Sequence, residues 1–293
     1  MKVNFIRKLR MKSRKRKIDL VVLSDIHLGT YGSHARELYE YLRSIKPATL
    51  ILNGDIIDIW QFSKHYWPPD HMRVVKEFLR MASKGTRIIY ITGNHDEMFR
   101  KFSGIHLGNI EITNMLEMNL NGERVWFFHG DVFDVIMQHS RWLEKLGSKG
   151  YDFLVLLNVF VNFIAKLLGR KKVSLSRRIK ENVKTAVKYI GQFEITAARL
   201  AIENGFQSIV CGHIHYPEIR KINTEKGSIM YLNSGDWIEN LTALEYTTDT
   251  WKLYKYGERN EAPNTVTENE QDDHIMEMDN KEVFKMVMKE FQM

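Results

Sequence analysis

Acidic, amide and imidazole side chains recur in this sequence directly after short apolar runs. Such side chains bind metal ions or move protons. The ordered motifs are Asp25-x-His27, Gly54-Asp55, Gly93-Asn94-His95-Asp96, His129-Gly130-Asp131 and Gly212-His213-x-His215. Each motif alone is common by chance, but the ordered set, each beside a glycine or another small residue, is far harder to reach by chance. We therefore interpret the motifs as parts of one metal site.

The donor types indicate the class of ion. Carboxylates, imidazoles and an amide oxygen suit borderline-hard divalent cations, whereas a soft site would need thiolates. Seven candidate ligands exceed the needs of one ion, and hydrolytic sites often hold two ions about 3.5–4 Å apart. The candidates are Asp25, His27, Asp55, Asn94, His129, His213 and His215. We expect two ions, with Mn²⁺ as the first choice and Fe²⁺, Zn²⁺ or Co²⁺ as alternatives.

Two of these motifs carry specific geometric expectations. Asp55 is the sole carboxylate of its motif, and its two oxygens can face two cations. His213 and His215 are two residues apart, so on an extended strand they would face the same side, each serving one ion.

The motifs must be brought together by strands. The apolar runs 18–23, 49–52, 87–91, 125–128 and 208–210 each lead into one motif. Residues 35–45 and 71–82 carry apolar side chains at helical spacing between the first three runs. The carboxyl ends of strands are where α/β sheets place their ligands, so the motifs are expected to meet at one edge.

Further runs predict a mixed α/β fold with two sheets, each covered by helices. Additional strands are expected over 110–113, 116–120, 229–232, 241–246 and 250–256. Residues 135–201 read as several helices without a strand, which indicates a helical insertion. Within it, residues 151–168 form an apolar pattern with a polar stripe. That helix either is buried in the core or binds lipid through its apolar face.

Composition excludes several classes of protein. The 293 residues are 44% hydrophobic, enough for a sizeable core, and the single cysteine, Cys211, excludes an internal disulfide. No spanning helix or export signal is expected, so the cytoplasm is the expected location, with peripheral attachment to the inner face of the cytoplasmic membrane as a possibility. Residues 259–293 suggest an acidic linker and a short C-terminal helix of unassigned role.

The net charge of +7 comes from the first 17 residues. Nine positive charges precede the first acid, Asp19, so the rest of the chain is close to neutral. We expect this basic arm, residues 1–17, to bind an anionic membrane surface. Nucleic acid is a less favoured partner. A disordered solubilising tail is the alternative. The sequence assigns no oligomeric state.

Together the motifs resemble the calcineurin-like metallophosphoesterase superfamily over roughly residues 18–256. The resemblance implies a four-layer α/β/β/α sandwich with a di-metal centre, formed by a domain of residues 18–258. It implies that Asp25, His27 and His215 hold the first ion, that Asn94, His129 and His213 hold the second, and that Asp55 bridges them. It also implies a hydrolase of phosphoric ester or pyrophosphate bonds.

A narrower resemblance is to the UDP-2,3-diacylglucosamine pyrophosphatases of the lipid A pathway. It is carried by Ser24-Asp25-Ile26-His27-Leu28-Gly29, Asp55-Ile56-Ile57-Asp58, Trp67-Pro68-Pro69, His129-Gly130-Asp131-x-Phe133-Asp134 and Asn233-Ser234-Gly235-Asp236-Trp237. This resemblance implies a lipid-linked nucleotide as substrate, cleaved to lipid X and UMP. The chain departs from the best-defined branch of that family, which has Arg where this chain has His95.

Roles outside the ligand set follow from position. His95, beside Asn94, is the expected catalytic residue, donating a proton to the leaving oxygen or binding the phosphoryl group. Asp96 either orients that imidazole or pairs with a backbone amide. Asp131 and Asp134 are expected to support the ligands rather than bind metal. Substrate contacts are expected from Trp67, Arg170, Lys171 and Lys172.

Two other functions remain open at this point. One is a phosphodiesterase acting on nucleotides or nucleic acid, which the basic arm suggests. The other is a non-catalytic metal-binding scaffold, against which the complete ligand set and His95 argue.

Overall fold

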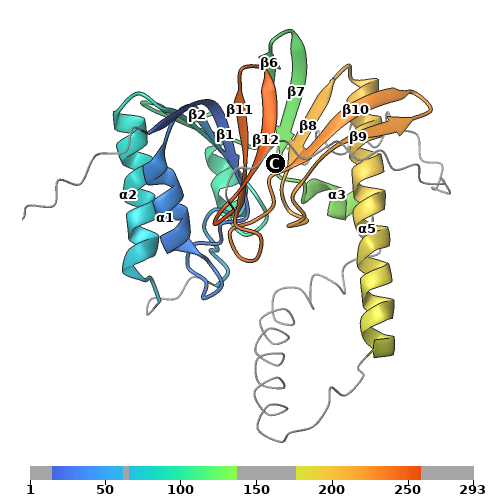
Figure 1. Ribbon diagram of the computed structural model, residues 1–293, viewed down its shortest axis with the longest axis horizontal. Helices are drawn as coiled ribbons and strands as arrows, with labels where there is room; N and C mark the ends of the chain where they lie inside the picture. Colours follow the sequence, from blue (N-terminus) through green and yellow to red (C-terminus); the bar gives the residue numbers. More distant parts are fainter. Residues whose placement is uncertain (1–14, 62–65, 137–175, 259–293) are drawn as a thin grey trace, which may run out of the picture.

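Two β-sheets packed face to face form the centre of the protein (Figure 1). The computed structural model describes residues 15–61, 66–136 and 176–258. The first sheet has the strand order β12-β11-β1-β2-β3-β5-β4 and the second β6-β7-β8-β10-β9. The first sheet comprises β1 (Arg16–Leu23), β2 (Ile45–Asn53), β3 (Arg87–Ile91), β4 (His106–Leu107), β5 (Ile110–Thr113), β11 (Thr242–Thr247) and β12 (Thr250–Lys255). The second comprises β6 (Met115–Leu120), β7 (Glu123–Phe128), β8 (Ser208–Cys211), β9 (Glu218–Thr224) and β10 (Gly227–Asn233).

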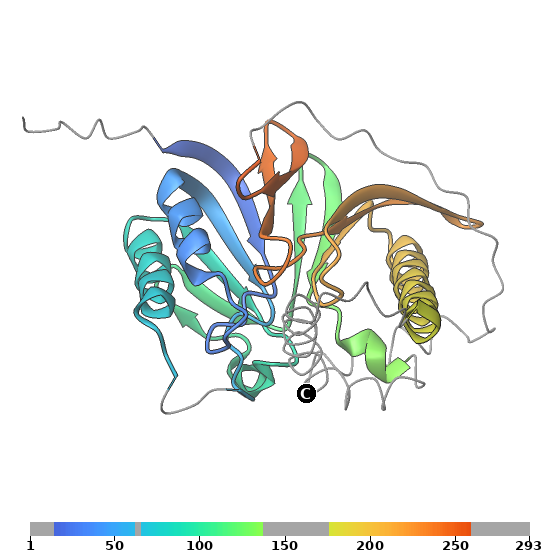
Figure 2. The same cartoon turned by 60° about the horizontal axis from the view of Figure 1, so that its bottom comes forward.

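Helices cover the outer face of each sheet. The helices are α1 (Ala35–Ser44), α2 (Pro69–Ser83), α3 (Val132–Ile136), α5 (Ser176–Glu203) and the 3₁₀ turn η1 (Glu97–Phe102). Figures 1 and 2 show α1 and α2 outside the first sheet and α5 outside the second. The expected four-layer α/β/β/α arrangement is therefore confirmed.

The alternation of side chains along each central strand explains the four layers. In β1, Leu20 and Val22 enter the core between the sheets, whereas Val21 and Leu23 enter the core beneath α1 and α2. In β7, Phe127 faces the first sheet and its neighbours Trp126 and Phe128 face α5. Because both faces of these strands are covered, the strands read in the sequence as unbroken apolar runs.

Strand direction places the loops of the two sheets at a common edge. Strands β1, β2, β3 and β5 are parallel, as are β7, β8 and β10. The loops that follow β1 and β2 are joined by a hydrogen bond from Asp25 N to Gly54 O (3.1 Å). The second sheet meets them there, because His213 N donates to Asp25 Oδ2 (3.1 Å).

Several elements differ from the sequence-based expectation. Strand β2 begins at Ile45, four residues before the predicted start, although it contains Pro47, which cannot donate to a ladder. The Pro47 carbonyl instead accepts a hydrogen bond from the Thr86 hydroxyl (2.9 Å). The elements β4, β9 and η1 were not predicted, since β4 spans two residues, η1 is a 3₁₀ turn and the seven residues of β9 are mostly polar.

The boundaries of the basic arm and of the helical insertion also differ from those predicted. β1 begins at Arg16, whose guanidinium binds both oxygens of Glu245 (2.7 and 2.8 Å). Lys15 donates to the carbonyl of Ile45 (3.1 Å), so these two cations belong to the fold rather than to the arm. Residues 193–201 of the expected insertion form part of the α5 layer. Residues 137–175 lie outside the described residues. Among the described residues, no helix is long and apolar enough to cross a membrane.

The α5 layer can be tested through its buried leucine. Leu200 is 1% exposed in the core beneath α5, whereas Leu79 on α2 is 55% exposed. Leu200→Ala is expected to lower the free energy of unfolding by about 2–5 kcal/mol because it leaves a cavity. Leu79→Ala is the matched control, with a change within about 0.5 kcal/mol. Equal losses in urea titrations would show that α5 does not contribute to the core.

Candidate metal centre

The expected ligands converge where the two sheets meet. Three of them, Asp25, His27 and His215, bring one donor atom each to within 4.8 Å of one another. A second group of the same size consists of Asp55, His129 and His213. Asn94 follows Gly93, where an added Cβ would lie 2.3 Å from Asp55 Oδ1 and 2.8 Å from His129 Cδ2. The structure thus brings six expected ligands into two half-sites and places Asn94 beside the second.

The first half-site joins β1 to the loop after β8. Asp25 Oδ1 lies 3.1 Å from His215 Nε2. Burial raises the pKa of Asp25, but the charge of His215 outweighs it and holds the pKa at about 2. Burial lowers the pKa of His215, but Asp25 reverses this and raises it to about 9. In the absence of a cation these two groups therefore form an ion pair.

The second half-site is more deeply buried, with His129 fully inaccessible. His129 Nδ1 donates to the carbonyl of Asn53 (2.9 Å), which leaves Nε2 facing Asp55 Oδ2 at 3.2 Å. His213 Nε2 lies 3.0 Å from Asp134 Oδ2. Hydrogen bonds of this kind fix the tautomer and orientation of metal-binding imidazoles. Asp134 therefore holds the ring of His213, one of the expected ligands.

Asp55 lies between the half-sites, with Oδ2 near an imidazole of each. Its Oδ2 is 3.8 Å from His27 Nε2 and 3.2 Å from His129 Nε2. Its Oδ1 accepts a hydrogen bond from His95 N (2.8 Å). The expectation that the two oxygens of Asp55 face two ions stays a prediction, and the structure adds a backbone hydrogen bond to one of these oxygens.

The backbone at the ligands is unusual. Five of the nine non-glycine residues with positive φ among the described residues are expected ligands: Asp25, His27, Asp55, His213 and His215. Such conformations cost on the order of 1–3 kcal/mol each and persist where the surroundings enforce them. His213 and His215 lie in a loop after β8, so the prediction that they share one face of a strand was wrong. The two imidazoles belong to different half-sites, one to each.

The donor atoms fit divalent cations. Asp25 Oδ1, His27 Nε2, Asn94 Oδ1 and His129 Nε2 are buried and have no partner in hydrogen-bond geometry. Three of these atoms face an ionisable group at 3.1, 3.2 or 3.8 Å, but a buried polar atom without a hydrogen bond costs about 1–3 kcal/mol, so the four favour a further partner. Gly93 and Gly212 leave the room required, since a Cβ on Gly212 would lie 2.6 Å from Asp25 Oδ2. Two ions held by these residues would satisfy the unpartnered atoms.

His95 has a carboxylate partner that sequence reasoning missed. Asp58, 1% exposed, places Oδ2 2.9 Å from His95 Nδ1 and 3.3 Å from His27 Nδ1. Although burial disfavours its charge, hydrogen bonds from His27 and His95 hold the pKa of Asp58 below its usual range. Burial lowers the pKa of His95, but the hydrogen bond to Asp58 reverses this and raises it. The spacing Asp55-x-x-Asp58 was the available signal.

The structure also decides the role of Asp96 and places the expected substrate contacts. Asp96 accepts from the backbone of Gly93 (2.6 Å) and Ile56 (2.9 Å), so it pairs with amides rather than with His95. Trp67 packs against the core beneath α1 and α2. The aromatic ring beside His95 is that of Trp60, 56% exposed, with ring centroids 4.9 Å apart. Arg170, Lys171 and Lys172 lie outside the described residues.

Comparisons with known proteins identify similar sequences. The family model for calcineurin-like phosphoesterases matches residues 18–217. A UDP-2,3-diacylglucosamine hydrolase of Aliivibrio fischeri (strain MJ11) is 23% identical over 252 residues, covering 80% of this chain and 98% of the relative. One of Aeromonas salmonicida (strain A449) is 26% identical over 233 residues, covering 76% and 87%. A solved phosphoesterase from E. coli covers 81% of this chain and 93% of its own at 15% identity, with a TM-score of 0.42.

Asp55 provides the test of a two-ion centre. Asp55→Asn keeps the shape but removes the charge that lies between the half-sites, so both ions should be lost. Metal per chain after dialysis, measured by elemental analysis, is expected to fall from two ions toward none. Asp19→Asn, an exposed carboxylate on β1, is the matched control and should retain both. Two ions retained by Asp55→Asn would refute the bridging role.

Proposed function

The chain belongs to the calcineurin-like phosphoesterase family and is a metal-dependent hydrolase of phosphoester bonds, and from this premise we propose that it cleaves the pyrophosphate of UDP-2,3-diacylglucosamine. The products are 2,3-diacylglucosamine 1-phosphate (lipid X) and UMP. The observation that supports this substrate is the shared name of relatives matched along nearly their whole length, up to 98%. The complete pair of half-sites supports catalysis over a scaffold role.

Each residue of the centre has a defined task in this reaction. Asp25, His27 and His215 would hold one ion, Asn94, His129 and His213 would hold the other, and Asp55 would supply negative charge to both. When bound, the ions supply Lewis acidity that lowers the repulsion between a phosphate group and an attacking water. Mn²⁺ is the ion we propose, with Fe²⁺, Zn²⁺ or Co²⁺ as alternatives.

His95 is the catalytic residue that we assign to the leaving group. Asp58 binds its Nδ1, which leaves Nε2 as the ring nitrogen that donates a proton to the departing phosphate oxygen. As the P–O bond breaks, this proton balances the charge that develops on the oxygen. The ring of Trp60 beside His95 limits its orientation and its access to water.

The acyl chains are assigned to the segment between α3 and α5. α3 begins directly after His129-Gly130-Asp131, and α5 leads into β8, which ends beside His213, so both ends of the segment are tied to strands that carry ligands. The sequence places an apolar helix pattern at 151–168 and the cations Arg170, Lys171 and Lys172 in this segment. Burial of a substrate methylene there would contribute about 0.8 kcal/mol.

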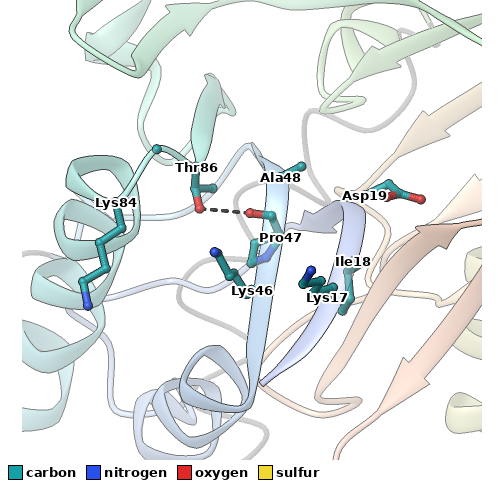
Figure 3. Close-up of a pocket in the computed structure, with 9 residues that line it drawn as sticks. Lys17, Ile18, Asp19, Lys46, Pro47, Ala48, Lys84 and Thr86 are labelled. Atoms are coloured by element: carbon teal, nitrogen blue, oxygen red, sulfur yellow. Dashed lines mark hydrogen bonds between the residues drawn. The ribbon is translucent and has the colours of Figure 1, made fainter. Parts of the chain in front are cut away.

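The basic arm precedes β1, whose first residues lie at the end of the first sheet opposite the metal centre. β1 begins at Arg16 and reaches the metal centre only after Leu23. Beside its start is a depression of about 370 Å³ lined by Lys17, Lys46 and Lys84 (Figure 3), with Asp19 as the acid in its lining. We assign arm and depression to an anionic membrane surface, each cation contributing about 1 kcal/mol. Attachment would then be separate from catalysis.

A hydrolysis panel tests the substrate. The chain, loaded in turn with Mn²⁺, Mg²⁺ and Zn²⁺, is given UDP-2,3-diacylglucosamine, UDP-sugars, cyclic nucleotides and oligonucleotides. The highest kcat/KM is expected for UDP-2,3-diacylglucosamine, with UMP as a product. Preference for oligonucleotides or cyclic nucleotides would overturn the assignment in favour of a nucleotide or nucleic-acid phosphodiesterase.

His95→Ala separates catalysis from metal binding. The variant is expected to keep two ions, because the ring is not a ligand, while kcat falls by about 10²–10⁴-fold, as for loss of a general acid. Asp58→Asn should lower kcat by less. Elemental analysis and steady-state kinetics of the same preparations provide the readout. Loss of an ion from His95→Ala would make His95 a ligand and contradict its assigned role.

Deletion of residues 1–14 tests the arm while sparing β1. The truncated chain should leave anionic vesicles at lower salt than the full chain, because fewer cations face the lipid phosphates. Hydrolysis of a soluble chromogenic phosphodiester should be unchanged. Vesicle sedimentation at increasing salt is the measurement, and equal binding by both chains would move the membrane contact elsewhere.

A further inference from the structure

The turn after β10 holds the two half-sites in place without supplying a ligand. We call residues Asn233, Ser234, Gly235, Asp236 and Trp237 the 233–237 turn. The four side-chain-bearing residues of this turn are 0% exposed, including the polar Asn233, Ser234 and Asp236. Buried polar groups are retained where they make specific hydrogen bonds. Those bonds lead to the loops that carry ligands of both sheets.

Asn233 binds the loop of the second sheet. Its Nδ2 donates to the carbonyl of Gly212 (2.9 Å), the residue before His213, and its Oδ1 accepts from Gly235 N (2.9 Å). The amide therefore links the end of β10 to the point where the chain enters the positive φ of His213 (65°). The ladder pairing of β8 and β10 ends at Asn233 and Cys211, and a backbone bond from Ser234 N to Cys211 O (3.1 Å) follows it. The Gly212 carbonyl is reached by the side chain of Asn233.

Ser234 and its neighbours bind the loop of the first sheet. The hydroxyls of Ser234 and Ser24 are 2.6 Å apart, and Ser24 Oγ also contacts the carbonyl of Gly235 (2.8 Å). Trp237 N donates to the carbonyl of Asp25 (3.0 Å). The turn thus contacts Asp25 on both sides, although Asp25 belongs to the other sheet.

Asp236 fixes the approach to His215. Its Oδ1 accepts from the backbone of Ile238 (2.7 Å) and Glu239 (2.5 Å). Its Oδ2 accepts from Asn240 Nδ2 (2.5 Å), which also reaches the carbonyl of His215 (2.8 Å). The same turn therefore also contacts the part of the loop after β8 that carries His215.

We propose that the 233–237 turn sets the distance between the two metal half-sites, with Asn233 positioning His213 and the Ser24–Ser234 pair positioning Asp25. The inference rests on the metal centre of the proposed function. Its physical basis is that ligands on strained loops keep their positions only where tertiary contacts enforce them. The two loops come from different sheets, and the turn lies against both.

The test compares metal binding by full-length variants. Asn233→Asp places a carboxylate against the Gly212 carbonyl and should weaken the ion held by His213, while Ser234→Ala should weaken the ion held by Asp25. Each is expected to raise one of the two Mn²⁺ dissociation constants by about 10–100-fold, the usual effect of losing a residue that supports a ligand. Elemental analysis gives the stoichiometry, and electron paramagnetic resonance distinguishes a coupled Mn²⁺ pair from single ions.

Matched controls keep the result specific. Asn109 Nδ2 donates to the carbonyl of Ala82 at the same 2.9 Å, so Asn109→Asp makes the same chemical change away from the centre and should retain a coupled pair. Ser24→Ala removes the same serine pair from the other side, so it should raise the same Mn²⁺ dissociation constant as Ser234→Ala does. The double variant should raise that constant little further. His213→Ala and Asp25→Asn supply the spectra of chains that have lost one known ligand.

The outcomes separate this inference from the proposed function. If Asn233→Asp does not fold, the two serine variants carry the test. Two ions bound with unchanged affinity by the serine variants, or equal metal loss from Asn109→Asp, would overturn the role of the turn. Failure of the metal centre itself would appear in the unaltered chain as fewer than two ions. A wrong substrate would appear only in hydrolysis.

Discussion

The burial of ionisable donors at one edge of the sandwich is the constraint on which the rest of this structure depends. Asp25 and Asp55 are 0% and 2% exposed, and His129 is fully buried. Ionised carboxylates are not stable in such surroundings unless opposite charge lies close to them. Here imidazoles provide part of that opposite charge. Burial alone would raise the pKa of Asp55, but His129 above all holds it well below its usual range. The buried donor atoms that remain without a hydrogen bond indicate where cations would supply the rest of the opposite charge.

A second row of residues makes this arrangement specific. Each imidazole is held through one nitrogen: His129 by the Asn53 carbonyl, His213 by Asp134, and both His27 and His95 by Asp58. His215 is the exception, since its Nδ1 lies 3.9 Å from Asp236 and its side chain is 36% exposed. The half-site formed with Asp25 is therefore more open than the half-site around His129. An incoming phosphate would meet the more open half-site first.

The two ends of the first sheet have different chemistry. The carboxyl ends of the strands carry the acids and imidazoles, and the amino ends carry the lysines around the depression in Figure 3. This separation follows from strand direction, because parallel strands present all their following loops at one edge. The attachment to an anionic surface that we propose would therefore be at the opposite end of the first sheet from the metal centre. α5 follows the segment that we assign to the acyl chains and packs against the second sheet.

The sequence by itself determined the strands, the motifs and the class of chemistry. Apolar runs and donor types are local properties, so β1, β3 and β7 and the ligands that follow them could be read directly from the chain. Tertiary structure decided which atoms meet. Asp58 reaches His27 across 31 residues, Ser24 reaches Ser234 across 210, and Asp55 turns one oxygen to the backbone of His95. The left-handed backbone of His213 and His215 likewise depends on these contacts, because local periodicity favours an extended strand there. A pattern of residue types specifies which groups can bind a metal, but their orientation is set by partners that are distant in the sequence.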